Sequence, residues 1–143
     1  MYKRVFLDAN ILVDVYDLKR PFSSYSQKVL MSLLQNESVE IFTSCDIITT
    51  IYYLRAKANK EHALDDIIQI NEFCNIIEFG NTEVTKSCRL MKQNKNFTDL
   101  EDTIQYVMAK KVKADLILSN DKSFASDGIS LMSAEKFCME MKL

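Results

Sequence analysis

The sequence is poor in residues that interrupt regular structure and in residues that bind transition metals. Its 143 residues include two glycines, one proline, one histidine and no tryptophan. So little glycine argues against an all-β sandwich, which uses glycine at its many turns, and against collagen-like or linker chains. The hydrophobic content of 48% and charged content of 27% are those of a globular protein, and the length predicts one domain, residues 1–143.

The cysteines do not form a metal or disulfide pattern. Cys45, Cys74, Cys88 and Cys138 are widely spaced, with no CxxC pair and no histidine beside them. A zinc site and a disulfide framework are therefore not expected, and free thiols are typical of a reducing compartment. No apolar run approaches the roughly 20 residues that span a bilayer, and the first residues do not resemble a signal peptide. We expect a soluble, cytoplasmic protein without membrane contact.

Positive and negative charges nearly cancel. Eighteen lysines and arginines stand against 20 aspartates and glutamates, which gives a net charge of −2. This balance excludes a strongly basic nucleic-acid binder of the histone kind. Any contact with nucleic acid would have to use a local patch of cations.

Apolar spacing predicts strands and helices in alternation. Short apolar strands are predicted at residues 4–7, 40–43, 75–78, 114–118 and 129–132. Helical spacing is predicted at residues 11–16, 23–34, 46–57, 62–73, 82–91 and 100–113, with a last helix from Ser133. The alternation predicts an α/β fold of three layers, α/β/α, around a central, mostly parallel sheet.

Acidic residues follow the predicted strands, where a parallel sheet has its functional crevice. Asp8 comes directly after the first strand, and Asp121 follows the strand at 114–118. Asp99 and Asp102 begin the helix that leads into that strand, and their spacing of three places them on one side of it. The same spacing predicts that Glu101 points elsewhere.

These acids together predict a metal site. Four carboxylates, those of Asp8, Asp99, Asp102 and Asp121, would repel one another strongly unless a divalent cation neutralised them. Oxygen ligands favour a hard ion, Mg²⁺ or Mn²⁺, and such a site can orient a phosphodiester and activate water for its hydrolysis. Each acid alone also has a structural interpretation, as a helix cap or a turn residue. The joint pattern favours the metal site.

Three segments of the chain carry a shared pattern. Residues 5–14 are VFLDANILVD, residues 99–109 are DLEDTIQYVMA and residues 116–124 are LILSNDKSF. In this order and spacing they resemble the motifs of the PIN domain family, the nuclease fold of VapC-type toxins. The resemblance covers nearly the whole chain.

The resemblance implies a metal-dependent ribonuclease. The catalytic acids that it implies are Asp8, Asp102 and Asp121, with Asp99 as a supporting or metal-binding acid. It also implies an RNA substrate, a small antitoxin protein that plugs the crevice, and a homodimer. A dimer surface and ordinary core are both open interpretations of one apolar helix face, made of Val29, Leu30, Leu33 and Leu34.

Neutral residues are expected to support the acids. Asn10 and Ser119 match positions of the family that hold the acids through hydrogen bonds. Thr50 departs from the family, because it stands where PIN domains usually carry a glutamate on the helix after the second strand. A hydroxyl supplies no charge but can position a metal-bound water, so the change weakens the site without abolishing it. Asp46, one helical turn earlier, either compensates or caps the helix.

Several cations are candidates for contacts with RNA phosphates at the rim of the crevice. They are Lys19, Arg20, Arg55, Lys57 and Lys122. Such contacts would bind the backbone without reading bases. The alternative for each is an ordinary solvated surface charge.

Two other functions stay open. The first is a non-catalytic PIN-like module that binds RNA or protein, in which Thr50 marks a decayed metal site. The second is a phospho-acceptor receiver domain, which also gathers acids at strand ends. A receiver, however, carries an aspartate after its third strand, where residues 78–81 of this chain are EFGN.

Overall fold

A computed structural model describes all residues, 1–143. The strands are β1 (Arg4–Leu7), β2 (Glu40–Ser44), β3 (Asn75–Ile77), β4 (Leu116–Leu118) and β5 (Ser130–Met132). The helices are α1 (Ala9–Tyr16), α2 (Ser23–Gln35), α3 (Ile47–Phe73), α4 (Asn81–Gln93), α5 (Leu100–Lys111) and α6 (Ala134–Met141). None of the helices has the length and apolar character needed to span a membrane.

The strands form one parallel sheet in the order β3-β2-β1-β4-β5. β1 lies at the centre, where Phe6 is opposite Phe42 of β2 and Ile117 of β4. The chain moves outward from β1 to β2 and β3, then returns to add β4 and β5 on the other side. The order of the strands therefore reverses beside β1, which is where open α/β sheets bind ligands beyond the carboxyl ends of their strands.

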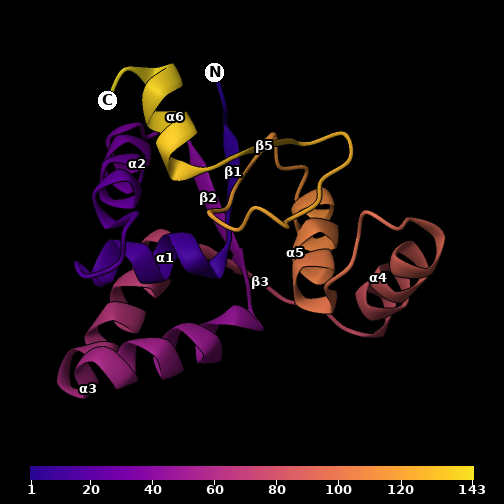
Figure 1. The fold of residues 1–143 in the computed structure, drawn as a ribbon, viewed down its shortest axis with the longest axis horizontal. Helices are drawn as coiled ribbons and strands as arrows, with labels where there is room; N and C mark the ends of the chain where they lie inside the picture. The colour runs from indigo at the N-terminus through magenta and orange to yellow at the C-terminus, as the bar shows by residue number, and fades with distance from the viewer.

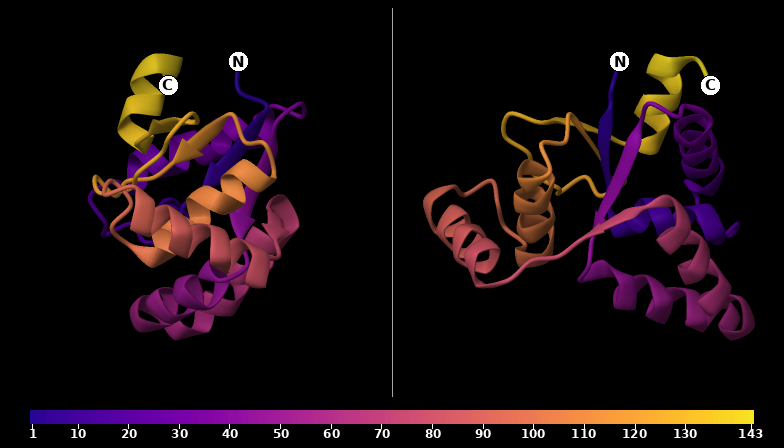
Figure 2. Two further views of the ribbon diagram at one scale, coloured as in Figure 1. Left: turned by 90° about the vertical axis from the view of Figure 1, so that its right-hand side faces the viewer. Right: turned by 180° about the vertical axis from the view of Figure 1, so that it is seen from behind.

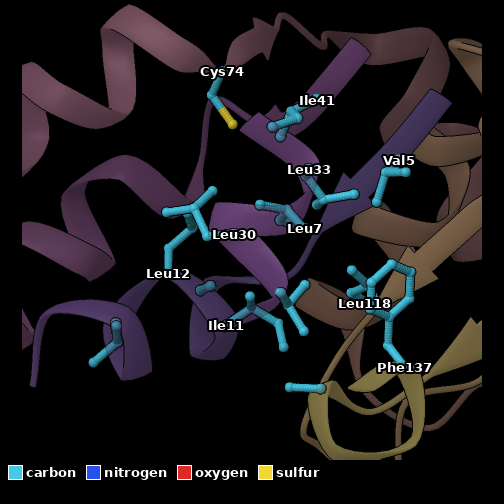
Figure 3. Close-up of a cluster of buried hydrophobic side chains, with 14 of the residues drawn as sticks. Val5, Leu7, Ile11, Leu12, Leu30, Leu33, Ile41, Cys74, Leu118 and Phe137 are labelled. Atoms are coloured by element: carbon cyan, nitrogen blue, oxygen red, sulfur yellow. The ribbon is translucent and has the colours of Figure 1, made fainter. Parts of the chain in front are cut away.

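Alternate residues of the strands pack on opposite sides of the sheet. Val5, Leu7 and Leu118 belong to one apolar cluster, whereas Phe6 and Ile117 belong to another. Figure 1 shows α1, α2, α3 and α6 on one side of the sheet and α4 and α5 on the other, and the reverse view in Figure 2 agrees. Figure 3 shows the first cluster, in which Val5 and Leu7 lie among side chains of α1 and α2. The predicted three-layer α/β fold is confirmed.

The two helices predicted at 46–57 and 62–73 form one bent element. α3 runs through both, and its backbone leaves the helical region at Asn59, with φ −158° and ψ 95°. Across the bend, Arg55 Nε donates to Asp66 Oδ2 at 2.7 Å, and the two side chains are 7% and 11% exposed. The pair joins the two arms of α3, and the cost of removing both charges from water offsets most of their attraction, so a buried pair of this kind adds little net stability.

The apolar face of α2 belongs to the core of the chain itself. Val29, Leu30 and Leu33 are buried in the cluster that also contains Leu7 and Leu12 of β1 and α1. Only the last residue of the predicted face, Leu34, is exposed. This face is therefore not the surface on which the expected homodimer would form.

Removing one member of the Arg55–Asp66 pair should destabilise the fold more than replacing both. Asp66→Leu leaves the arginine buried without a counter-charge, and breaking a buried pair typically costs about 3–5 kcal/mol. The double variant Arg55→Met/Asp66→Leu removes both charges and should recover most of that loss. Urea unfolding of the wild type, both single variants and the double variant measures the coupling; simply additive losses would contradict the prediction.

Candidate active site

A pocket of about 310 Å³ opens beyond the carboxyl ends of β1 and β4. Five carboxylates line it, those of Asp8, Asp99, Glu101, Asp102 and Asp121. The sheet supplies Asp8 and Asp121 from the strands on either side of the reversal, and α5 supplies the others from its first turn and cap. The structure thus places in one pocket the four acids that the sequence pattern brings together.

Asp8 is the most firmly held of these acids. Its carboxylate accepts hydrogen bonds from the Ala9 N–H at 2.7 Å, the Asn10 amide at 2.9 Å and the Ser119 hydroxyl at 2.7 Å. Only 3% of the residue is exposed, and this burial raises its pKa, with Asp121 adding to the rise and the hydrogen bonds opposing it. Asn10 and Ser119 therefore contact Asp8 as expected.

A second layer of hydrogen bonds holds Asn10 in turn. Its side-chain oxygen accepts from the backbone N–H of Asn120 at 2.9 Å. The Asn120 amide donates to Asp14 Oδ2 at 2.6 Å and accepts from the Ala134 N–H at 2.9 Å. Asp14 is buried and also pairs with Arg20. This network, which joins α1, the end of β4 and the start of α6, was not predicted, although an acid amid the apolar residues of the first helix was a signal for it.

The start of α5 points at the pocket. Asp99 caps the helix by accepting from the Asp102 N–H at 2.9 Å. Burial raises the pKa of Asp102 to about 7, and the negative charges of Asp8, Asp99 and Asp121 add to this rise. The raised pKa values of Asp8 and Asp102 thus have two causes: burial, which is the larger, and repulsion between neighbouring carboxylates.

Glu101 corrects the expectation that it points elsewhere. It lines the same pocket, and burial together with the charge of Asp46 raises its pKa. The reason is that α5 meets the pocket with its end, and side chains of a helix tilt toward its N-terminus, so successive residues of the first turn surround the opening. Spacing along one face does not describe this end-on arrangement.

Asp121 combines turn and pocket positions. Its Oδ1 accepts from the Ser123 N–H at 2.9 Å and from the Ser123 hydroxyl at 2.7 Å, and its own N–H donates to Ser119 Oγ at 3.1 Å. These bonds use one carboxylate oxygen and fix the orientation of the group. Asp121 therefore stabilises the turn and also lines the pocket.

Thr50 is not among the residues that line the pocket, whereas Leu54, one helical turn later, is. Asp46 stands at the N-cap position of α3 but makes no capping hydrogen bond, and it accepts instead from the hydroxyl of Ser44. The capping interpretation of Asp46 is therefore wrong. Its negative charge acts on Glu101 at the edge of the pocket.

Gln105 lies beneath the pocket and was not predicted. It follows Asp102 by three residues on α5, is 1% exposed, and neither its amide oxygen nor its amide nitrogen has a hydrogen-bond partner. Its amide is close enough to Asp8 to lower the pKa of that carboxyl slightly. A polar residue within the apolar run from Ile104 to Ala109 was the available signal, since a buried unpaired amide typically costs about 1–3 kcal/mol.

No three acidic, histidine or cysteine side chains stand close enough together, as they are oriented, to form a metal-ligand group. Hydrogen bonds contribute to the separation of the carboxylates, because Asp99 and Asp121 each direct one oxygen to a neighbouring backbone N–H. The second oxygen of each makes no hydrogen bond. The side chains of the pocket that can ligate a metal thus offer oxygen, mainly from carboxylates, and no histidine or cysteine lines it.

The predicted RNA-binding cations lie in different surroundings. Arg20 lines the pocket, and Lys122 lines a shallow neighbouring hollow together with Asp121. Lys57 is exposed but lines neither pocket. Arg55 was expected at the rim, but it is buried in its pair with Asp66, so it is not available to a phosphate.

Comparisons with known proteins agree with this geometry. A sequence model of the PIN domain matches residues 4–123. The curated protein Ribonuclease VapC1 of Aquifex aeolicus (strain VF5) is 47% identical over 136 residues, which cover 95% of this chain and 94% of that protein.

Solved structures share the fold at low sequence identity. VapC20 of Mycobacterium tuberculosis, described as a sarcin-ricin loop cleaving toxin, has a TM-score of 0.71 and 11% identity over 87% of this chain and 95% of that chain. VapBC2 from Rickettsia felis, bound to a DNA fragment from its promoter, has a TM-score of 0.70 and 17% identity over 91% and 98%. These likenesses concern the fold alone.

The crowded carboxylates predict that the protein loses stability as pH rises when divalent cations are absent. Unfolded, Asp102 releases its proton near pH 3.8, whereas the folded protein holds it until about pH 7. Between these values the folded state binds more protons, so the free energy of unfolding falls with rising pH and stays lower above pH 7. Urea unfolding at pH 5 and pH 8, in chelator, measures the difference.

The matched variants are Asp102→Asn and, as a control on an exposed helix face, Glu140→Gln. Asp102→Asn should reduce the difference between the two pH values, because the neutral amide neither titrates nor repels its neighbours. Glu140→Gln should leave it unchanged. An equal difference in the wild type and Asp102→Asn would contradict the prediction.

Proposed function

Because this chain belongs to the PIN domain family, we propose that it is the ribonuclease toxin of a toxin–antitoxin pair and hydrolyses RNA phosphodiester bonds with a divalent metal. One observation carries the proposal: five carboxylates line a single pocket at the reversal of strand order. The curated relative is named as a ribonuclease, which supports the same activity here. Family membership also removes the receiver-domain alternative.

The donor set of the pocket fits a hard divalent cation, Mg²⁺ or Mn²⁺. Asp8, Asp99, Asp102 and Asp121 would hold it, since they offer oxygen ligands only. Burial raises the pKa values of Asp8 and Asp102, and neighbouring carboxylates add to the rise; the positive charge of a bound cation would offset both effects. When bound, the metal supplies positive charge for the phosphate oxygens and lowers the pKa of water.

The residues of the chain itself position the reacting groups. Asp8 presents its carboxylate in one orientation because Ala9, Asn10 and Ser119 donate to it. The N-terminus of α5 opens on the pocket, and its dipole favours the negative charge of a bound phosphate. Arg20 lies at the rim with its side chain 37% exposed, so it supports contact with the RNA backbone.

We propose in addition that a small antitoxin protein covers the pocket. α3 exposes several large apolar side chains, Tyr53, Leu64 and Ile68, which are 60%, 59% and 50% exposed. Such a surface suits a protein partner better than water. The homodimer implied by the family stays a prediction, which size-exclusion chromatography with light scattering tests.

Cleavage of a panel of structured RNAs tests the nuclease directly. Purified protein should cut in Mg²⁺ or Mn²⁺ and stop in chelator. Asp102→Asn should lower kcat/KM by at least about 10²-fold, the scale of losing one charge-stabilising group. Thr50→Ala is the control and should retain activity, because Thr50 does not line the pocket. Activity that survives chelator or Asp102→Asn would contradict the proposal.

Metal binding separates the nuclease from the non-catalytic module. Titration calorimetry should show that the wild type binds Mn²⁺ and that Asp8→Asn binds it weakly or not at all. Bound Mn²⁺ should raise the urea midpoint at pH 8, where carboxylate repulsion is greatest. A wild-type protein that neither cuts RNA nor binds Mn²⁺ would favour the decayed site.

A further inference from the structure

A second cavity, larger than the carboxylate pocket, lies between α4 and α5 and has a volume of about 660 Å³. We call it the α4–α5 groove. Its charged lining consists of four cations, Lys86, Arg89, Lys110 and Lys111, and two acids, Glu83 and Asp127. It shares no residue with the carboxylate pocket. Figure 1 shows α4 and α5 side by side, on the face of the sheet that the other helices leave free.

The positive charge of this region is a property of the sequence. Residues 84–113 contain seven of the 18 lysines and arginines of the chain, in a protein of net charge −2. The acids in this stretch are Asp99, Glu101 and Asp102, and all three line the carboxylate pocket. Within residues 84–113 the acids therefore lie at the carboxylate pocket, apart from the cations of the groove. The groove has more cations than acids, as a site that binds an anion needs.

Three of the cations that line the groove are not neutralised. Lys86 and Arg89 are exposed and form no ion pair, and Lys110 lies over the ring of Tyr106 at 5.7 Å. Lys111 differs, because its Nζ donates to the carbonyl of Glu78 at 3.0 Å and pairs with Glu83 at 3.4 Å. Lys86, Arg89 and Lys110 thus remain free to bind an anion.

The groove and the carboxylate pocket are joined by α5. Asp102 at one end of this helix and Lys110 near the other are eight residues apart, which is about 12 Å along the axis. Gln93 ends α4, lines the groove and precedes the cap Asp99 by six residues. A phosphodiester chain placed in the pocket therefore needs to continue about 12 Å along α5 to reach Lys110, the free cation on that helix.

We propose that the α4–α5 groove binds the backbone of the RNA substrate on one side of the bond that is cut. The inference rests on the proposed function and adds to it a second site of contact. Lysine and arginine bind phosphates without reading bases, so the groove contributes affinity and register rather than sequence specificity. It also explains how a protein of net negative charge holds a polyanion.

A triple variant, Lys86→Gln/Arg89→Gln/Lys110→Gln, tests the groove. The control, Lys3→Gln/Lys28→Gln/Lys60→Gln, removes the same charge from exposed lysines outside both cavities. Binding of a fluorescent single-stranded RNA is measured in Asp8→Asn protein without metal, over a range of salt concentrations. The groove variant should lose about tenfold in affinity and lower the salt slope by roughly 2, as expected for three lost phosphate contacts, and the control should change neither.

Kinetics of the same substitutions in otherwise wild-type protein give the second measurement. The groove variant should raise KM with kcat unchanged, and its affinity for Mn²⁺ should equal that of the wild type. Equal RNA affinity and KM in the groove and control variants would overturn the inference while leaving the nuclease intact, and would favour an acidic protein as the occupant. Failure of the wild type both to cut any RNA and to bind Mn²⁺ would instead overturn the proposed function and this inference with it.

Discussion

The parallel pairing of β1 with β4 determines where the carboxylate pocket lies and how Asp8 is held in it. It brings Asp8 and Ser119, 111 residues apart, within 2.7 Å of each other, and it places the reversal of strand order between them. The register Leu7 opposite Leu118 is fixed because both side chains belong to the same buried cluster. A slip of one residue would turn these apolar side chains to the other face and separate Asp8 from its donor.

The parts predictable from sequence are those governed by local periodicity. Strands and helices follow from apolar spacing, and the strand-end rule then locates Asp8 and Asp121, since both follow buried apolar runs directly or within a short turn. Asn10 and Ser119 could be predicted from the family pattern, and the side chains of both donate hydrogen bonds to Asp8. Predictions of this kind require no knowledge of how helices approach one another.

The parts not predictable depend on that approach. Glu101 reaches the pocket because α5 meets it end-on, and Arg55 is buried because α3 bends at Asn59 and brings Asp66 back toward it. The spacing of apolar residues predicts neither the angle at which a helix packs on its neighbours nor a bend that lacks proline. Gln105 was missed for a related reason. A single polar residue in an apolar helical run can be noticed in the sequence, but the sequence does not show which group it faces.

α5 carries acids in its first turn and cations in its last, which is the arrangement that the helix macrodipole favours. Glu101 and Asp102 therefore have a folding benefit that is independent of any reaction, as do Lys110 and Lys111. A descendant of this protein that had lost its activity would keep these residues under selection for the helix alone. Asp8 has such a benefit too, because it caps α1 by accepting from the Ala9 N–H. Gln105 has none, since its buried amide lacks a hydrogen-bond partner, so its retention among relatives is the better diagnostic of a working enzyme.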